Sequence, residues 1–492
     1  MTEYIYSLLF AASMGLAWQL PGTKVASLLG FIAAFSLVVS IRQARKPYFA
    51  AYLAGFAVQT PGFYWLIGTI SNFGGFTLIP SLVLFLLFVA ISATQFLIIV
   101  FLWKNLPKWT DTLSIQTAIA VALSEIFSIR IFPWAFAHTQ LGFHQFSQIA
   151  DIAGTQLVSF LLVATCELIA KILIFRKVKP AYFFVLIFFG LAVFYGQNRI
   201  EHFSNLKNET VKVALVQANI SIEEKHNIKL FKRNTEEYIK LTNKISGNNL
   251  FVVWPESVIT DWIFEGTEHT NQDRRLSYLN NNRAMLVGAL TYRDQETFFN
   301  SAVAVNSDGS IQRPYHKQIL MPFGEYTPLG KTFPFLKELN ATAGDFSEGK
   351  DVKVFTYPKF KDLDVAPLIC YEDIAPSLSR KAARAGAKLL VNITNDAWFG
   401  NTHAPYQHHL IASFRSIENR RALVRSTNSG LTAIVDPLGR TLSQIKPFSS
   451  GVLIQEVPLL KELSIYTKFL GDLPFKLLIL LPACTFLIRR FK

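Results

Sequence analysis

A single cysteine, Cys370, ends an apolar run in the polar part of this chain. The run reads VAPLIC over residues 365–370 and continues as YED. The other two cysteines, Cys166 and Cys484, lie inside hydrophobic stretches, so Cys370 has no neighbouring thiol with which to form a disulfide. A free thiol in this setting is a candidate nucleophile for acyl transfer.

A carboxylate and an amine of suitable type precede this cysteine. Glu256 lies in the motif WPES, directly after an apolar run, and Lys317 lies in the motif YHKQ. A thiol needs a base or a cation beside it to react at neutral pH. Because Glu256, Cys370 and the pair Asn395-Asp396 each follow a predicted strand, they can converge on one pocket. The set predicts a cysteine acyltransferase or an amide-cleaving enzyme.

Each of these residues also has an ordinary structural explanation. A lone cysteine such as Cys370 commonly packs as a small buried hydrophobe. Glu256 could stand at a helix N-terminus after the turn residue Pro255, and Lys317 could be a solvated surface lysine. Only the three residues together favour a catalytic role over these structural ones.

Composition divides the chain into two kinds of sequence. Of its 492 residues 51% are hydrophobic and only 17% are charged, against about 25% charged in a typical soluble protein. Long apolar stretches dominate the first part and return near the end, so we expect a membrane protein with a large water-exposed domain before its last span. The predicted domains are a transmembrane region at 1–200, a catalytic domain at 205–465, and a final span with a basic C-terminus at 470–492.

Eight stretches have about the length that a helix needs to cross the hydrocarbon core. The first has no basic residue in its leader and no obvious cleavage site, so we predict a retained span and not a signal peptide. The predicted spans are 4–19, 25–41, 48–69, 77–103, 112–130, 155–175, 181–197 and 473–489.

Basic residues follow every even-numbered span, which predicts the orientation of the chain. Lys and Arg concentrate in cytoplasmic loops, and long domains cross the membrane largely regardless of charge. The large domain should therefore face the periplasm from the cytoplasmic membrane of a bacterium with two membranes. The same placement accounts for the net charge of +14 without nucleic-acid binding. The basic exits are Arg42, Arg45 and Lys46; Lys104 and Lys108; Lys171, Arg176, Lys177 and Lys179; and Arg489, Arg490 and Lys492.

The large domain alternates short apolar runs with helical stretches, which predicts a layered α/β fold. The helical stretches are 223–245 and 376–386, and Asp308-Gly309 between two runs predicts a hairpin turn. The predicted strands are 211–219, which ends in polar residues, 250–254, 284–290, 302–305, 363–369, 388–393 and 431–435.

Taken together, the motifs resemble a specific family. Glu256 in WPES, Lys317 in YHKQILMPFGEYTP and Cys370 in PLICYED are similar to the Glu-Lys-Cys triad of the nitrilase, or carbon-nitrogen hydrolase, superfamily. The flanking motifs PFGEYTP, NITNDAWFG and RSTNSGLTAIVDPLGR, with seven spans before the domain and one after it, resemble the apolipoprotein N-acyltransferase family. The resemblance implies a membrane α-helical bundle of about eight spans and an extracytoplasmic nitrilase-like α-β-β-α sandwich.

The resemblance also implies a mechanism without metal or cofactor. Glu256 would remove the proton of Cys370, and the thiolate would attack an ester carbonyl of a phospholipid. Lys317 and the backbone N–H after Cys370 would stabilise the oxyanion. The acyl thioester would then pass to the N-terminal amine of an apolipoprotein that carries a diacylglyceryl-cysteine.

Four further positions match the family motifs. Glu325 in PFGEYTP matches a second essential acid that orients Lys317, and Tyr371 and Glu372 match essential neighbours of the nucleophile. Trp398 in NDAWFG matches an aromatic residue of the substrate loop, although core packing explains a single tryptophan nearly as well. The chain departs from the family at 221–226, where a tryptophan is missing, and at Asn419, which replaces a glycine.

Other polar residues and other functions are weaker candidates. Glu125 lies in an apolar run, where pairing with a neighbour explains it better than function. His403, His408 and His409 lack a cysteine or paired carboxylates at ligand spacing, so we predict no metal site. The alternative enzyme is a membrane-tethered amidase that releases ammonia. A transporter or receptor is disfavoured by the triad and by the scarcity of charge within the spans.

Overall fold

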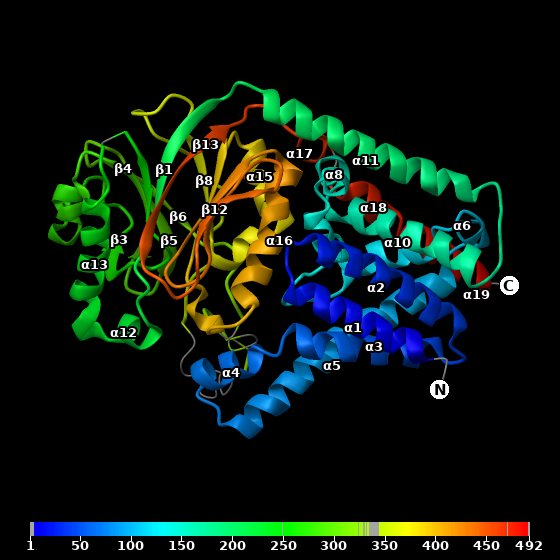
Figure 1. Cartoon of the computed structure of the whole chain (residues 1–492). Helices are drawn as coiled ribbons and strands as arrows, with labels where there is room; N and C mark the ends of the chain where they lie inside the picture. The colour runs from blue at the N-terminus through cyan, green and yellow to red at the C-terminus, as the bar shows by residue number, and fades with distance from the viewer. Residues whose placement is uncertain are drawn as a thin grey trace.

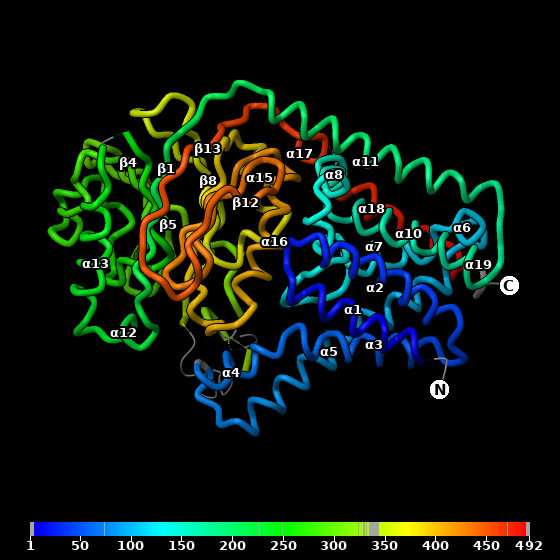
Figure 2. The backbone as a smooth tube through the Cα atoms, in the orientation of Figure 1, coloured from blue at the N-terminus to red at the C-terminus, as the bar shows by residue number. Residues whose placement is uncertain are grey.

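The computed structural model describes residues 4–247, 249–322, 324–327, 330, 332–333, 344–469 and 471–490. An α/β sandwich stands at one end of a long helical region, and both chain termini lie near the opposite end (Figure 1). The backbone trace follows the same division, with the first eleven helices and the last two on one side of the molecule (Figure 2). The predicted motif residues Phe323 and Pro328 and the terminal Lys492 lie outside the described residues.

Helices form wherever the sequence is continuously apolar, because a helix satisfies its own backbone hydrogen bonds. Within the described residues, four helices are long and apolar enough to cross a membrane: α2, α5, α10 and α11. They coincide with four of the eight predicted spans and make these four candidate spans, while all eight crossings of the membrane remain predictions. The helices are α1 (Ile5–Gln19), α2 (Lys24–Gln43), α3 (Pro47–Gly62), α4 (Leu66–Gly74), α5 (Leu78–Asn105), α6 (Lys108–Thr112), α7 (Gln116–Phe127), η2 (Phe136–Gly142), α8 (His144–Ser147), α9 (Ala150–Ala153), α10 (Thr155–Leu173), α11 (Tyr182–Asn205), α18 (Leu473–Leu477) and α19 (Leu480–Arg490).

Two of the predicted spans are interrupted. The span predicted at 48–69 divides into α3 and α4, because Pro61 and Gly62 at the end of α3 are poor residues for continuing a helix. The span predicted at 473–489 divides into α18 and α19. The break after α3 places α4 below the sandwich, beside the loops at its lower end (Figure 1).

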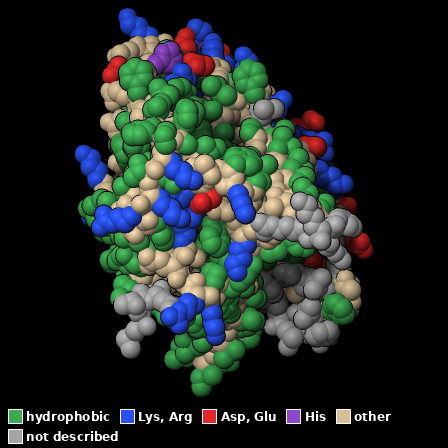
Figure 3. Space-filling model, turned by 90° about the vertical axis from the view of Figure 1, so that its right-hand side faces the viewer, with side chains coloured by type: hydrophobic (Ala, Val, Ile, Leu, Met, Phe, Trp, Pro, Cys, Tyr) green, Lys and Arg blue, Asp and Glu red, His purple; other side chains and the backbone are tan. Residues whose placement is uncertain are grey.

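Lys and Arg gather at the end of the helical region that points away from the sandwich. Figure 3 looks at this end and shows their side chains among hydrophobic ones. The last turn of α5, the start of α6 and the loops that follow α2 and α10 contribute exposed basic residues, namely Arg45, Lys46, Lys104, Lys108, Arg176, Lys177 and Lys179.

The sandwich consists of two sheets packed face to face, which confirms the predicted layered α/β arrangement. The first has the order β13-β1-β2-β4-β5-β6, with β3 beside β4, and the second has the order β12-β11-β10-β9-β8-β7. Apolar side chains of both sheets, such as Val253 and Ile393, fill the interior. The strands are β1 (Glu209–Gln217), β2 (Phe251–Val253), β3 (Ile259–Phe264), β4 (Ala284–Tyr292), β5 (Phe298–Val305), β6 (Ile311–His316), β7 (Phe355–Thr356), β8 (Asp364–Ile369), β9 (Leu389–Thr394), β10 (Ala422–Thr427), β11 (Thr432–Val435), β12 (Thr441–Ile445) and β13 (Gly451–Leu459).

Helices cover both outer faces of the sandwich. Tyr238 of α13 (Phe231–Asn243) packs on the first sheet. Leu378 of α15 (Pro376–Arg384) and Ala412 of α16 (Ala404–Asn419) pack on the second. The helix predicted at 223–245 is broken at Asn227 into α12 (Ile222–His226), a short 3-10 turn and α13. The hairpin predicted at Asp308-Gly309 joins β5 to β6.

Strand direction brings the candidate residues to one edge. β2 and β4 are parallel, β6 runs the same way through two antiparallel pairings, and β8, β9 and β10 are parallel to one another. The two sheets meet at the ends of these strands, where Ser426 of β10 donates a hydrogen bond to the carbonyl of Val253 at 3.1 Å. Residues that follow parallel strands collect at such an edge.

Candidate active site

Cys370 occupies a strained turn directly after β8. It opens the short 3-10 helix η6 (Cys370–Ile374) with φ of 53°, a left-handed value that is uncommon outside glycine. The side-chain amide of Asn392 on β9 donates to the carbonyls of Leu368 and Cys370, at 3.1 and 3.0 Å, and holds the turn. Strain of this kind costs about 1–3 kcal/mol and clusters at active sites. The thiol is half-buried at the edge of the sandwich.

Glu372 ties this turn to the segment that follows β6. Its fully buried carboxylate accepts hydrogen bonds from the backbone N–H of Ile369 at 2.7 Å, of Gln318 at 2.6 Å and of Ile319 at 3.2 Å. The hydroxyl of Tyr315 donates a fourth at 2.9 Å. Burial raises the pKa of Glu372 to about 7, although every one of these donors favours the ionised form. Glu372 therefore fixes the geometry between the cysteine and Lys317.

Lys317 stands between two carboxylates at the end of β6. Its Nζ lies 2.7 Å from Oε2 of Glu325 and 3.4 Å from Oε1 of Glu256. The side-chain amide of Asn300 donates to both acids at 2.8 Å. Burial alone would lower the pKa of Lys317, but Glu325, Cys370 and Glu256 together raise it well above its usual range. The ammonium is therefore permanently charged.

Glu256 is held by a close approach of two backbones. The turn that carries it lies against Gly288 on β4, where an added Cβ would come within 2.2 Å of the carbonyl oxygen of Pro255. Only glycine leaves room for this turn, and Val258 N–H completes it by donating to the Gly288 carbonyl at 2.9 Å.

The thiol needs a base in this environment. Burial raises the pKa of Cys370, the charge of Glu256 raises it further, and Lys317 and a hydrogen bond with Thr394 act in the opposite direction. The resting residue is therefore a thiol with a carboxylate and an ammonium close enough to act on it electrostatically. This is the arrangement that general-base activation of a cysteine requires.

Lys225 is a second cation at the site, and no local sequence pattern predicts it there. It lies on α12, and its Nζ donates to the backbone carbonyl of Glu256 at 2.8 Å. Burial lowers the pKa of Lys225 to about 8, against the opposing charges of Glu256 and Cys370. Lys225 falls in the segment 221–226 that departs from the family pattern, and only the fold brings it next to Glu256.

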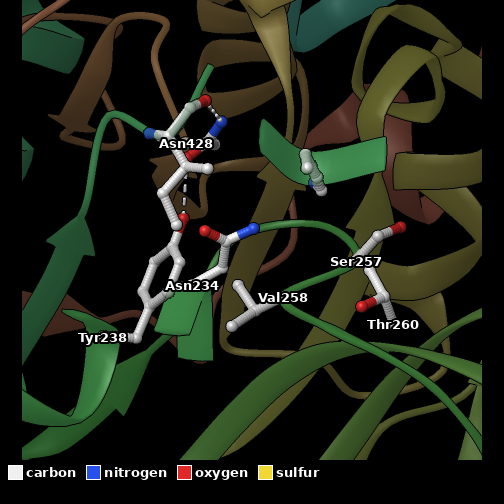
Figure 4. Close-up of a pocket in the computed structure, with 8 residues that line it drawn as sticks. Asn234, Tyr238, Ser257, Val258, Thr260 and Asn428 are labelled. Carbon is white, nitrogen blue, oxygen red and sulfur yellow. Dashed lines mark hydrogen bonds between the residues drawn. The ribbon is translucent and has the colours of Figure 1, made fainter. Parts of the chain in front are cut away.

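A small cavity adjoins Lys225 and the Glu256 turn. Its volume of about 10 Å³ is roughly that of one water molecule. Figure 4 shows Asn234 and Ser257 on its rim and the Tyr238 hydroxyl donating to Asn428, at 2.9 Å. Asn428 also donates to the side-chain oxygen of Asn395 at 3.1 Å, so the cavity belongs to the network that joins the two sheets.

Tyr371 and the backbone of Trp398 contact the helical region. The Tyr371 hydroxyl donates to the carbonyl of Ile131, and its ring lies 6.3 Å from that of Phe132. Trp398 is half-buried in the 3-10 turn η7 (Asp396–Phe399), and its carbonyl accepts from the hydroxyl of Thr69 on α4 at 3.0 Å. Of the seven predicted site residues, the structure thus gathers Glu256, Lys317, Glu325 and Glu372 with Cys370, and joins Tyr371 and the Trp398 backbone to the helical region.

The remaining polar candidates have structural partners. One oxygen of Glu125 accepts from the backbone N–H of Phe136 at 2.8 Å and from Ser159 at 3.1 Å. His409 binds the hydroxyl of Thr441 at 2.9 Å, and His408 is paired with two aspartates. Among the residues that the structure describes, no group of three His, Cys, Asp or Glu side chains is arranged to hold a metal ion.

Comparison with known proteins gives matches over both regions. The family model for carbon-nitrogen hydrolases matches residues 212–462, and the model for the apolipoprotein N-acyltransferase N-terminal domain matches residues 10–168. The apolipoprotein N-acyltransferase of Geobacter metallireducens is 29% identical over 494 residues, covering 96% of this chain and 92% of that protein. The enzyme of the same name from Shewanella oneidensis is 30% identical, covering 70% of this chain and 67% of that protein. A solved Saccharomyces cerevisiae member of the nitrilase superfamily covers 51% of this chain and 90% of its own, with 17% identity and a TM-score of 0.38.

Proposed function

The chain belongs to the apolipoprotein N-acyltransferase family of carbon-nitrogen hydrolases and is an acyltransferase, and we propose that it acylates lipoproteins through a thioester on Cys370. The acyl donor is a phospholipid. The acceptor is the N-terminal amine of an apolipoprotein whose first residue is a diacylglyceryl-cysteine. The observation that carries the proposal is the Lys317 ammonium between Glu256 and Glu325 at the strand edge of Cys370.

In the first half-reaction Glu256 takes the thiol proton and Cys370 attacks the ester carbonyl. Negative charge then develops on the carbonyl oxygen, where Lys317 and the backbone N–H of Tyr371 stabilise it. Glu256 returns the proton to the departing lysophospholipid oxygen, and the acyl group remains as a thioester.

In the second half-reaction the lipoprotein amine attacks the thioester. Glu256 takes a proton from the amine, the same cation stabilises the second oxyanion, and the thiol of Cys370 is released as the amide forms. Glu325 holds Lys317 in place in both steps, supported by the backbone N–H of Met321 at 2.8 Å. Glu372 orients the nucleophile turn, and Tyr371 and Trp398 contact the lipid chains.

The two regions have complementary jobs in this proposal. Residues 1–200 and 470–492 form eight spans, and residues 205–465 form the catalytic domain on the periplasmic side of the cytoplasmic membrane. The basic loops at the far end of the helices support this orientation, because Lys and Arg favour the cytoplasmic side (Figure 3). The contacts of Tyr371 and Trp398 with Ile131 and α4 support entry of lipid substrates from the bilayer.

The decisive experiment traps the acyl-enzyme. Purified protein is incubated with a phospholipid that carries a labelled acyl chain, quenched in acid, and digested to locate the label. We expect label on Cys370, released by hydroxylamine, and none in Cys370→Ala. Cys166→Ala and Cys484→Ala serve as matched controls and should label normally. Turnover by Cys370→Ala would refute the thioester mechanism, and release of ammonia from small amides without acyl transfer would favour the amidase.

Orientation is tested separately with two engineered cysteines. Lys108→Cys and Ser307→Cys are introduced into a Cys484→Ser chain, and intact spheroplasts are treated with an impermeant thiol reagent. We expect labelling at 307 and not at 108. The reverse pattern would place the catalytic domain in the cytoplasm.

A further inference from the structure

Four charged side chains form a buried ring behind Cys370 that the acyl-transfer steps do not use. His408 places Nε2 2.7 Å from Oδ1 of Asp373 and Nδ1 3.1 Å from Oδ1 of Asp396. Arg425 closes the ring by pairing with the second oxygen of Asp373 and, at 3.5 Å, with that of Asp396. Both aspartates and Arg425 have no exposed side-chain surface, and His408 has 9%. Two cations thus face two carboxylates.

The ring joins the two loops that border the thiol. Asp373 belongs to η6, three residues after Cys370, and Asp396 opens η7, two residues before Trp398. His408 lies on α16 and bridges them from behind. Asp396 also contacts the hydroxyl of Thr394 at 3.2 Å, and Thr394 hydrogen-bonds with the Cys370 thiol.

The loop of Trp398 is held from two opposite sides. On the helical side, Thr69 donates to the Trp398 carbonyl at 3.0 Å, and the Phe399 ring lies 4.9 Å from that of Trp65. On the sandwich side, His408 pairs with Asp396, and the centroid of its ring lies 6.3 Å from that of the Phe399 ring. The position of this loop relative to Cys370 therefore depends on the two cations that bridge Asp373 and Asp396, and His408 makes the closer contact with Asp396, 3.1 Å against 3.5 Å for Arg425.

Both ring nitrogens of His408 face carboxylate oxygens, so both serve best as donors. Burial and Arg425 lower the pKa of His408, but Asp373 and Asp396 outweigh them and raise it to about 9. The pKa of the adjacent His409 shifts in the opposite direction, because burial, Arg425 and His408 lower it to about 3. Two neighbouring histidines on one helix are thus held in different charge states.

We propose that His408 is a positioning residue that fixes the Cys370 turn and the Trp398 loop relative to each other. This arrangement places the ester carbonyl of the phospholipid acyl chain next to the Cys370 thiol. This rests on the proposed function, because the acyl donor is a phospholipid only within it. A misplacement of about 1 Å at a reacting centre can cost about 10²-fold in rate.

His408→Gln and His409→Gln form a matched pair in the full chain. Glutamine at 408 can donate to one aspartate only, whereas glutamine at 409 keeps the bond to Thr441. We expect His408→Gln to raise the KM for phospholipid and lower the acyl-enzyme formation rate, together by about 10²-fold in kcat/KM, while His409→Gln stays within about threefold of the parent chain. Equal kinetics for the two variants, at comparable melting temperatures, would overturn the proposal.

A second variant covers the case in which His408→Gln fails to fold. His408→Gln/Asp373→Asn also removes the carboxylate that Arg425 alone would have to balance, and leaves Arg425 facing Asp396. We expect it to fold, with acylation still impaired, because no group bridges the two loops through a charged pair. Normal acylation by this double variant would also overturn the proposal.

Alkylation separates this proposal from the function on which it rests. The rate at which iodoacetamide modifies Cys370 is measured in a Cys484→Ser chain, with no lipid present. A changed rate in His408→Gln but not in His409→Gln supports a role in holding the turn, even if acyl transfer through Cys370 were refuted. An unchanged rate combined with normal KM refutes the positioning role and leaves the thioester mechanism intact.

Discussion

Two clusters of charge, one in the helical region and one in the sandwich, differ in their balance of cations and carboxylates. In the first, Arg42 on α2 and Lys171 on α10 face Asp111 and Glu167. Each cation contacts both acids, and the backbone N–H of Thr117 donates to Glu167 at 2.7 Å. Two positive charges meet two negative ones, and the cluster links α2, α6 and α10.

The sandwich cluster has one carboxylate too many. Lys317 is the only side-chain cation among the described residues that contacts the carboxylates of Glu256 and Glu325, and Lys225 reaches only the backbone of Glu256. Where each carboxylate is balanced by a cation, protonation of a carboxylate is unfavourable. A carboxylate in excess of the cations can accept a proton more readily. The first cluster is therefore suited to holding helices together and the second to removing a proton.

The largest expected effect comes from removing the central cation of each cluster. Lys317→Met leaves two buried carboxylates facing each other and no cation for the oxyanion, so acyl-enzyme formation should fall by about 10²–10³-fold. Lys171→Met leaves the buried Glu167 with Arg42 as its remaining cation and should reduce stability by about 1–3 kcal/mol, with acylation per folded molecule within about threefold of the parent. The measurements are acyl-enzyme rate and thermal unfolding of both variants. If folded Lys171→Met lost as much acylation activity as Lys317→Met, the two clusters would not differ in function.

The next effect separates the two acids of the sandwich. Glu256→Gln removes the base, so acyl-enzyme formation should fall by about 10²–10⁴-fold. Glu325→Gln keeps the base and loosens Lys317, so formation and discharge should both slow. The two half-reactions are followed separately, with labelled phospholipid and then with an acceptor lipopeptide. Normal acyl-enzyme formation by Glu256→Gln would reassign the base, with Glu325 as the next candidate.

The strands that end at Glu256 and Cys370 could be predicted from the sequence, because the hydrophobic pattern of a strand is local. The runs before Glu256 and Cys370 are apolar, and β2 and β8 form where they predict. β10 and β13 were not predicted, since β10 carries the buried Arg425 and β13 is mostly half-buried, with a mixed polar and apolar pattern. The break between α3 and α4 depends on Pro61 and Gly62 within an otherwise apolar stretch.

The partners of the site depend on contacts between residues far apart in the chain. Asn300 reaches both acids from β5, and Lys225 reaches Glu256 from a helix 31 residues earlier. His408 lies 35 residues after Asp373. Nothing local in these segments marks them as part of a site, because their role comes from sheet order and helix packing.

The smallest expected effect concerns Lys225, which partly offsets the excess carboxylate. Its pKa of about 8 means that it is charged below pH 8 and neutral above it. Below pH 8 the charge favours the developing thiolate, so Lys225→Met should acylate about fivefold more slowly than the parent, equivalent to ~1 kcal/mol for a partly screened charge pair. Above pH 8 the parent loses the same charge, and the ratio of the two rates should approach one.

Taking the ratio at each pH cancels the titration of Cys370 and Lys317, which both chains share. Lys240→Met, on the exposed face of α13, is the matched control and should give a ratio near one throughout. The measurement is the acyl-enzyme formation rate of the three chains between pH 6.5 and 9. A ratio for Lys225→Met that does not change with pH would show that Lys225 acts only through its hydrogen bond to the Glu256 carbonyl, and the sandwich cluster would then keep its full excess of negative charge.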